Sequence, residues 1–312
     1  MAYLEKHLQD KTPRIETGFI PVGEDAMGKP IKIPFILAMG SKPGKRTVLT
    51  AGIHGDELNG QKVIHEVIKQ ISPEELAGTL ICFPVCNIPG FQSRERNFSD
   101  GIDLNHVMGT EKNKLPSHQY QKALLNEILL DADVLIDLHS ERKYIESCVF
   151  AYADLNNDKV RSVIETLQLD AVINHKASLT TLRGVCTSKK ITAVTIEIGG
   201  ALKCEMDKVH SCTEGIINHI NDTKSKIKTK ICNSSTWQMI ERGGYHTTNV
   251  NLLQNIEEGD IVDEVSNVFG EKLHQHKSKS KGIILGYNSF PLVEKGDKLI
   301  HIGLLEESVN EN

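Results

Sequence analysis

Three short segments of the chain carry residue types that bind metal ions. His54 and Glu57 form a His-x-x-Glu pair after an apolar run, and Asp137-Leu138-His139 and Thr195-Ile196-Glu197 each end another apolar run. Two imidazoles and one carboxylate are a standard ligand set for catalytic zinc, which keeps a fourth position open for water. Glu197 would then remain to act as a base. Together these residues predict a metal-dependent hydrolase with one Zn²⁺ per chain.

The spacing of His54 and Glu57 suits a shared ligand position. Both follow the predicted strand Arg46–Ala51, at the point where a helix is expected to begin. A separation of three residues in a turn, or in the first turn of a helix, points two side chains toward one spot. Gly52 and Gly55 would allow the tight backbone that such a turn requires.

His139 is the candidate third ligand because it ends a strand. It follows the predicted strand Val134–Leu138, and open α/β sheets place their sites at strand ends. Asp137 would share a face with His139 by the two-residue strand period, so that its carboxylate could fix the imidazole tautomer. Because the chain has 13 histidines, spacing alone leaves open that His54 caps a helix and that His139 is a core residue.

The first two-thirds of the sequence alternates β-branched runs with amphipathic stretches. Several runs are apolar on both faces, as expected for a sheet that helices cover on both sides. Strands alternating with helices of this length indicate an α/β sandwich with a mostly parallel or mixed sheet. The predicted strands are Lys32–Ala38, Arg46–Ala51, Thr79–Val85, Val134–Leu138, Cys148–Tyr152 and Ala193–Ile198, and the predicted helices include Gly60–Ile71, Ser117–Leu130 and Lys159–Leu167.

The pattern changes in the Lys/Thr/Ser-rich stretch 224–235, which is typical of a linker or a crossing strand. Beyond it, two similar units, Glu258-Gly259-Asp260 and Lys295-Gly296-Asp297, each precede a short apolar strand. They predict a small all-β domain with approximate internal symmetry, and they resemble the half-repeats of the barrel-sandwich hybrid fold. We therefore expect a catalytic domain over residues 1–228 and a β-domain over residues 229–312. In the latter, His274 and His276 are expected to share one exposed strand face.

The composition argues against several classes of protein. The net charge of -5 provides no basic surface for nucleic acid. No apolar run approaches the roughly 20 residues of a membrane-spanning helix, and the N-terminal segment is too polar for a signal peptide. The 7 irregularly spaced cysteines are therefore expected to be free thiols in the cytoplasm. Nothing here decides between a monomer and a homo-oligomer.

Four motifs between residues 32 and 219 occur in order: Gly52-Ile53-His54-Gly55-Asp56-Glu57, Asn87-Ile88-Pro89-Gly90 through Arg96 to Asp103-Leu104-Asn105, Asp137-Leu138-His139-Ser140, and Thr195-Ile196-Glu197-Ile198-Gly199-Gly200. With these motifs the chain resembles the succinylglutamate desuccinylase/aspartoacylase family, a branch of the zinc carboxypeptidase fold. The resemblance implies that His54, Glu57 and His139 bind zinc and that Glu197 is the general base. It also implies that Arg96 polarises the scissile carbonyl, although nearby Arg94 is an alternative.

One position departs from the family pattern. An arginine that pairs with a substrate carboxylate normally follows the Asp-Leu-Asn motif, whereas this chain has His106. Histidine cannot form a bidentate fork and is mostly neutral at pH 7. Asn105 and His106 are still expected to contact substrate, and Arg183 is a candidate from another loop to replace the missing arginine.

The sequence therefore predicts an amidohydrolase that cleaves the C–N bond of a small N-acyl amino acid or N-acyl amine with metal-activated water. The change at His106 favours a substrate other than N-acetylaspartate or succinylglutamate. Two alternatives stay open. One is a zinc carboxypeptidase acting on a small peptide, against which the missing arginine counts. The other is a non-catalytic, metal-dependent binding protein of the same fold.

Overall fold

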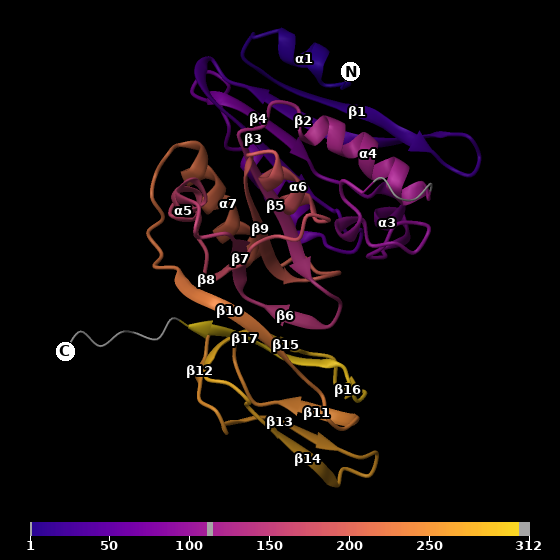
Figure 1. Cartoon of the computed structure of the whole chain (residues 1–312), viewed down its shortest axis with the longest axis vertical. Coiled ribbons are helices and arrows are strands. Elements are labelled where there is room, and N and C mark those ends of the chain that lie inside the picture. Colours follow the sequence, from indigo (N-terminus) through magenta and orange to yellow (C-terminus); the bar gives the residue numbers. More distant parts are fainter. Residues whose placement is uncertain (1, 111–114, 306–312) are drawn as a thin grey trace, which may run out of the picture.

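A mixed sheet of 13 strands runs through the computed structural model, which describes residues 2–110 and 115–305 (Figure 1). The strand order is β1-β2-β4-β3-β5-β9-β7-β8-β10-β17-β15-β12, with β6 pairing β15, and a separate sheet has the order β14-β13-β11-β16. The strands are β1 (Arg14–Glu24), β2 (Pro30–Met39), β3 (Lys42–Ala51), β4 (Ala77–Phe83), β5 (Val134–Glu141), β6 (Ile145–Ser147), β7 (Val149–Ala153), β8 (Ala171–Asn174), β9 (Thr192–Gly200), β10 (Lys230–Met239), β11 (Gly244–Thr248), β12 (Asn255–Ile256), β13 (Ile261–Ser266), β14 (Lys272–Lys277), β15 (Gly282–Asn288), β16 (Leu292–Val293) and β17 (Lys298–Leu305).

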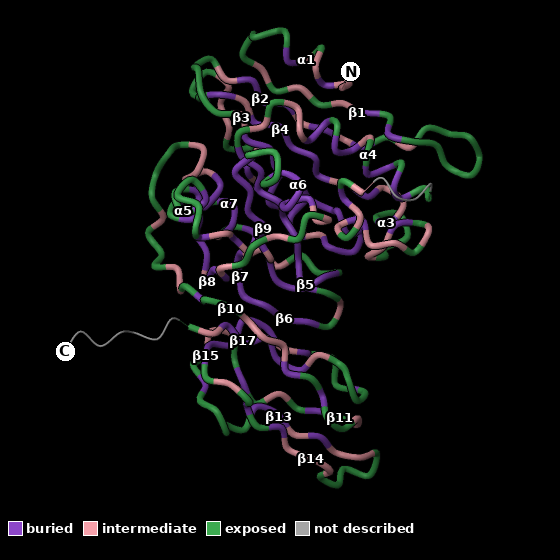
Figure 2. Tube along the Cα trace, viewed as in Figure 1, coloured by how far each residue is buried: buried purple, intermediate pink, exposed green. Residues whose placement is uncertain are grey.

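Helices cover both faces of the central strands, which are buried along their length (Figure 2). Helices α2, α5 and α7 pack on one face and α1, α4 and α6 on the other. The helices are α1 (Glu5–Gln9), α2 (Asn59–Ile68), α3 (Ile88–Ser93), α4 (Pro116–Ile128), α5 (Asp158–Ile164), α6 (Leu182–Ser188) and α7 (Met206–Ile220), with a 3-10 turn at Leu104–His106.

Strand β5 shows why the sheet needs two helical layers. All of its residues are buried. Ile136 and Leu138 pack into the core beneath α2, α5 and α7, whereas Leu135 packs into the core beneath α4 and α6. This two-residue alternation confirms the predicted α/β sandwich. It also places Asp137 and His139 on the α4/α6 side of the sheet.

The N-terminal strand β1 was not predicted. It pairs antiparallel with β2, from Arg14 opposite Met39 to Glu24 opposite Pro30. Most of its residues are exposed or half-buried, because it is the outermost strand of the sheet. Such a strand lacks the apolar run that marks a central one.

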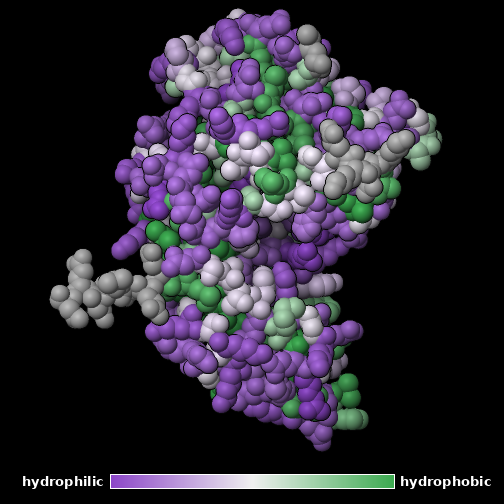
Figure 3. Space-filling view, in the orientation of Figure 1, coloured by the Kyte–Doolittle hydropathy of each residue, from purple (hydrophilic) through white to green (hydrophobic). Residues whose placement is uncertain are grey.

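The stretch 224–235, predicted as a linker or crossing strand, contains the beginning of strand β10, which continues the sheet. Lys230, Ile231 and Cys232 of β10 pair in parallel with β8, and the rest of β10 pairs antiparallel with β17. The main sheet therefore passes without a break from the α/β part of the chain into the C-terminal β-part. Figure 3 shows a hollow in the surface between these two parts.

The C-terminal part is all-β, as predicted, and its strands pair antiparallel with one another. The Glu-Gly-Asp and Lys-Gly-Asp turns lead into β13 and β17, respectively. The expectation that His276 is exposed is wrong: only 1% of it is accessible, because its Nδ1 bonds to the buried carboxylate of Asp263 at 3.0 Å. The 7 cysteines are all free thiols. No helix of the described chain combines the length and apolarity needed to cross a membrane.

Candidate metal centre

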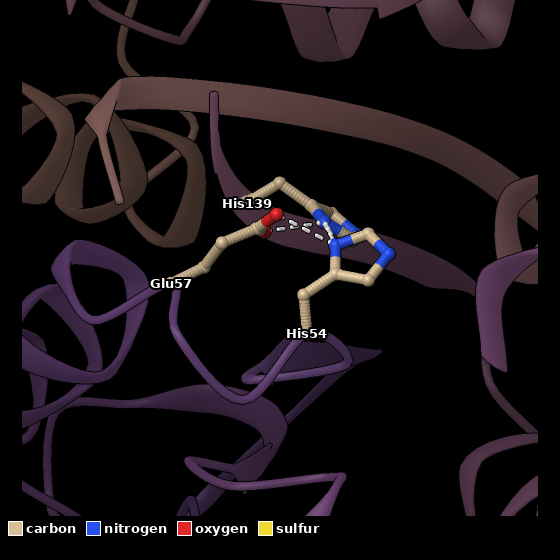
Figure 4. A group of neighbouring side chains, drawn as sticks. All are labelled: His54, Glu57 and His139. Atoms are coloured by element: carbon tan, nitrogen blue, oxygen red, sulfur yellow. Dashed lines mark hydrogen bonds and ion pairs between the residues drawn. The ribbon is translucent and has the colours of Figure 1, made fainter. Parts of the chain in front are cut away.

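His54, Glu57 and His139 meet in the interior of the molecule (Figure 4). His54 and Glu57 lie in the turn between β3 and α2, and His139 lies on the neighbouring strand β5. Their exposed fractions are 3%, 2% and 2%. Strand β3 pairs in parallel with β5, so the turn that follows β3 lies beside the carboxyl end of β5.

The three side chains direct their ligand atoms at one point. His54 Nδ1 lies 2.7 Å from Glu57 Oε1, and His139 Nδ1 lies 2.9 Å from Glu57 Oε2. The two Nδ1 atoms are 3.1 Å apart. Two nitrogens bound tetrahedrally to zinc at about 2.0–2.1 Å would be about 3.3 Å apart, so this separation fits a shared metal ion.

Two carboxylates, the buried Asp137 and the half-buried Asp103, fix the tautomers of these imidazoles. Asp137 Oδ2 accepts from His139 Nε2 at 2.9 Å, and Asp103 Oδ1 accepts from His54 Nε2 at 3.0 Å. Because an ionised carboxylate only accepts hydrogen bonds, each Nε2 carries the proton and each Nδ1 keeps its lone pair. Two lone pairs and the Glu57 carboxylate then face one another, an arrangement suited to a cation between them.

The charges around the centre favour a cation as well. Burial, the largest single influence, opposes ionisation of Glu57, but His54 and His139 outweigh it and lower the pKa of this carboxyl group. At His139, burial lowers the pKa, but the charges of Asp137 and Glu57 prevail and raise it well above its usual range. The site thus stabilises positive charge at the position where the ligand atoms converge.

The backbone of the His54–Glu57 turn is held against the loop that follows β4. Gly52 adopts a φ of 63°, which glycine tolerates best. A Cβ atom on Gly55 would lie 1.9 Å from the carbonyl carbon of Gly90. Gly90 is held in turn because its N–H donates to the Asn87 side chain, which caps α3, at 2.9 Å.

Arg96 extends from this second loop into the metal centre. Its Nη1 donates to Glu57 Oε1 at 2.8 Å and its Nε donates to Asp103 Oδ2 at 3.1 Å. At Asp103, burial opposes ionisation most strongly, but the hydrogen bond and charge of His54 and the charge of Arg96 outweigh it and lower the pKa. Arg94, the alternative to Arg96, is exposed and has a φ of 58°. The structure therefore brings Arg96, and not Arg94, to the candidate ligands.

Glu197 lies beside the centre on β9. It is the cross-strand neighbour of His139 in the parallel β5–β9 pair, and paired residues of adjacent strands project from the same face of a sheet. Burial is the main cause that raises the pKa of Glu197 to about 8, and the nearby Glu141 carboxylate adds to it, whereas His139 and Arg96 oppose it. A carboxyl group with such a pKa can exchange protons near neutral pH.

The three predicted substrate residues lie farther from the ligand atoms. Asn105 Oδ1 accepts from the Leu182 N–H at 2.8 Å, which leaves its amide N–H groups to donate elsewhere. His106 is exposed. Arg183 is buried, and its two terminal nitrogens bond to the carbonyl and ring of His175 at 2.8 and 2.9 Å. Neither His106 nor Arg183 contacts the metal centre.

Two carboxylates of the centre were not singled out from the sequence. Asp103 belongs to the Asp-Leu-Asn motif, but its contact with His54 could not be predicted because the two residues are 49 positions apart in the sequence. Glu141 is buried on β5, two residues beyond His139. The two-residue strand period could have indicated Glu141, because Asp137, His139 and Glu141 are each two residues apart and so project from the same face of the strand.

Comparisons with known proteins identify relatives of this chain and of its fold. The sequence profile of the succinylglutamate desuccinylase/aspartoacylase catalytic domain matches residues 43–221. The N-alpha-acetyl-L-2,4-diaminobutyric acid deacetylase of Halomonas elongata is 25% identical over 116 residues, or 37% of this chain. That stretch spans only 34% of the relative.

Solved structures match over nearly the whole chain. The product-bound ectoine utilization protein EutE (DoeB) from Ruegeria pomeroyi has a TM-score of 0.81 at 18% identity, covering 93% of this chain and 95% of that one. A succinylglutamate desuccinylase/aspartoacylase from Rhodobacter sphaeroides has a TM-score of 0.82 at 20% identity, covering 96% and 98%. At these identities the likeness establishes the fold.

Proposed function

The chain belongs to the succinylglutamate desuccinylase/aspartoacylase catalytic-domain family, and we propose that it is a zinc-dependent amidohydrolase acting on a small N-acyl amino acid or N-acyl amine. The observation that carries this proposal is the buried group of His54, Glu57 and His139, with Arg96 and Glu197 beside it. The deacetylase from Halomonas elongata supports the same class of reaction.

Zinc suits the ligand set of two imidazole nitrogens and one carboxylate. One ion bound there would act as a Lewis acid toward the scissile carbonyl and lower the pKa of the attacking water. His54, Glu57 and His139 would hold the ion, and Asp103 and Asp137 would keep the two imidazoles in the tautomer that binds it.

The protein's own groups account for the movement of protons and charge. In its ionised form, Glu197 takes a proton from the attacking water while the water oxygen bonds to the acyl carbon. Arg96, charged at any working pH, donates to the carbonyl oxygen as negative charge develops on it. Glu197 then delivers the proton to the departing nitrogen, so that the C–N bond breaks to give a carboxylic acid and an amine.

We propose that the substrate is neither N-acetylaspartate nor succinylglutamate. His106, which replaces the usual arginine, is exposed, and Arg183 is bound to His175. The amide of Asn105 remains to donate a hydrogen bond to substrate. Turnover of a panel of N-acyl amino acids tests this proposal, and efficient hydrolysis of N-acetylaspartate or succinylglutamate would contradict it.

Metal analysis of wild-type protein, His54→Ala and His139→Ala is the first test of the site. We expect about one zinc ion per wild-type chain and loss of zinc from both variants. Zinc retained in both variants, or absent from folded wild-type protein supplied with zinc, would overturn the proposed centre.

Glu197→Gln separates an enzyme from a binding protein. The amide keeps the shape of the side chain but cannot accept the proton of water, so turnover should be nearly abolished with zinc retained. Unchanged turnover would remove Glu197 as the base. A wild-type protein that binds N-acyl ligands but never hydrolyses them would favour the non-catalytic alternative.

We also propose a reducing compartment such as the cytoplasm, because all 7 cysteines are free. Thiol labelling of protein trapped in acid directly from cells tests this proposal, and intramolecular disulfides would contradict it.

A further inference from the structure

A lysine of the C-terminal β-part lies over an aromatic ring at the border with the α/β part. Lys298 begins β17, and its Nζ is 4.0 Å from the centre of the Trp237 ring on β10. The same ring stacks on His301, with 4.5 Å between ring centres and 11° between planes. Residues three apart on a regular strand point to opposite faces, but the β10–β17 pairing skips Leu299. This bulge turns Lys298 toward the face that carries His301 and Trp237.

Trp237, His301 and Lys298 together form an aromatic and cationic wall that adjoins the metal centre. His301 Nδ1 lies 3.8 Å from Glu141 Oε1, on the strand that carries His139. The His301 ring also meets the edge of Phe150, at 5.6 Å between ring centres. Phe150 is the cross-strand neighbour of Glu197. These three residues thus lie against Glu141 and Phe150, next to the strands that carry His139 and Glu197.

Within the part of the chain that the structure describes, the ammonium of Lys298 lies over the Trp237 ring without a carboxylate partner. Burial lowers the pKa of this ammonium, and the charges that act on it include Glu141, Arg96 and Glu197. Among residues 2–110 and 115–305, no carboxylate oxygen lies within 4.0 Å of Nζ. A half-buried ammonium that has no ion partner, on a ring that stacks against a neighbour of Glu141, is suited to bind an anionic group of a ligand.

We propose that Lys298 is a specificity-determining residue that binds a carboxylate of the N-acyl substrate, with Trp237 as the wall of that subsite. This inference rests on the proposed function and gives the anion a partner in place of the arginine absent at position 106. Arg96 is bonded to Glu57 and Asp103 and is already assigned to the scissile carbonyl, so a second cation is needed for the carboxylate.

The test compares an N-acetyl amino acid, chosen as the best substrate in a panel, with its primary amide, which lacks the carboxylate charge. In the zinc-loaded Lys298→Met variant, the side chain still packs on Trp237 without its charge. We expect kcat/KM for the acid to fall about 10- to 100-fold, mainly through KM, and kcat/KM for the amide to stay within about twofold. Lys298→Arg should restore most of the preference for the acid.

Lys295→Met is the matched control, because Lys295 is an exposed lysine in the turn that leads into the same strand. It should leave both substrates unaffected. An unchanged preference for the acid in Lys298→Met, with zinc content and thermal stability equal to wild type, would overturn the inference. An equal loss for acid and amide would also overturn it, since that result indicates only a packing contribution.

Calorimetric binding keeps this inference separate from the proposed function. The acid and the amide are titrated into zinc-loaded Glu197→Gln protein, with and without Lys298→Met. A selective loss of affinity for the acid would support Lys298 even if wild-type protein hydrolysed neither compound, a result that would refute the amidohydrolase proposal alone. Equal affinity for the acid with and without the lysine would overturn the Lys298 inference whatever the turnover.

Discussion

Replacing Asp137 by asparagine tests whether the carboxylate behind His139 sets the metal affinity. Asp137 is fully buried and accepts from His139 Nε2 at 2.9 Å and from Thr50 Oγ1 at 2.7 Å. In the variant, the amide nitrogen can donate to Nε2 and so favour a proton on Nδ1, the atom that would bind the metal. Loss of such a partner typically weakens metal binding about 10- to 100-fold, or about 1.4–2.7 kcal/mol. Competition with a chromophoric chelator at pH 7 would measure the zinc Kd.

Thr50→Val is the graded control for this experiment. It removes the second hydrogen bond to Asp137 but leaves the carboxylate charge facing His139. The loss of zinc affinity should therefore be less than about tenfold, because one net hydrogen bond contributes about 0.5–1.5 kcal/mol. If the Asp137→Asn variant folded normally and bound zinc within twofold of wild type, the assignment of tautomers would be wrong.

Three further outcomes follow from the packing and charge of named groups. Gly55→Ala should destabilise the fold by about 1–3 kcal/mol in urea unfolding, because its Cβ would lie 1.9 Å from the carbonyl carbon of Gly90; wild-type stability would contradict this close approach. Burial and the charge of Lys45 lower the pKa of His219 from 6.5 to about 4. His219 is therefore protonated at a higher pH in the unfolded chain than in the folded protein. For this reason the free energy of unfolding should fall as the pH drops from 6.5 to 4, by at most about 3 kcal/mol. His219→Gln should flatten the curve of stability against pH between 6.5 and 4, and an unchanged slope would count against the shift. Arg96→Lys keeps the charge but loses the fork, so turnover should fall about 100-fold with zinc retained; full turnover would exclude Arg96 from catalysis.

Local patterns in the sequence indicated which ligand atoms meet, and the family motifs selected these histidines from the 13 in the chain. His54 and Glu57 are three residues apart in one turn, and His139 lies near the end of a strand whose apolar residues require a central position. Because β3 and β5 are parallel neighbours, these two local signals converge at the same end of the sheet. Glu197 reaches the same end of the sheet because β9 is the parallel neighbour of β5 and pairs Glu197 with His139.

Residues whose environment depends on distant pairing could not be predicted in this way. Lys298 approaches the catalytic groups only because β17 pairs with β10 and a bulge reverses the direction of one side chain. His276 was expected to face solvent, since strand alternation does not reveal that its partner Asp263 lies buried on β13. Strand β1 gave no signal because half-buried outer strands carry no apolar run.

The unbroken sheet has a consequence for any shortened form of this protein. A chain ended at residue 228 would lose β10 and leave the backbone of β8, from Ala171 to Ile173, with a row of unpaired donors and acceptors. Such an open edge is a template for pairing with other chains and promotes aggregation. The C-terminal part therefore shields the catalytic part from self-association, and the two should unfold together in one cooperative transition.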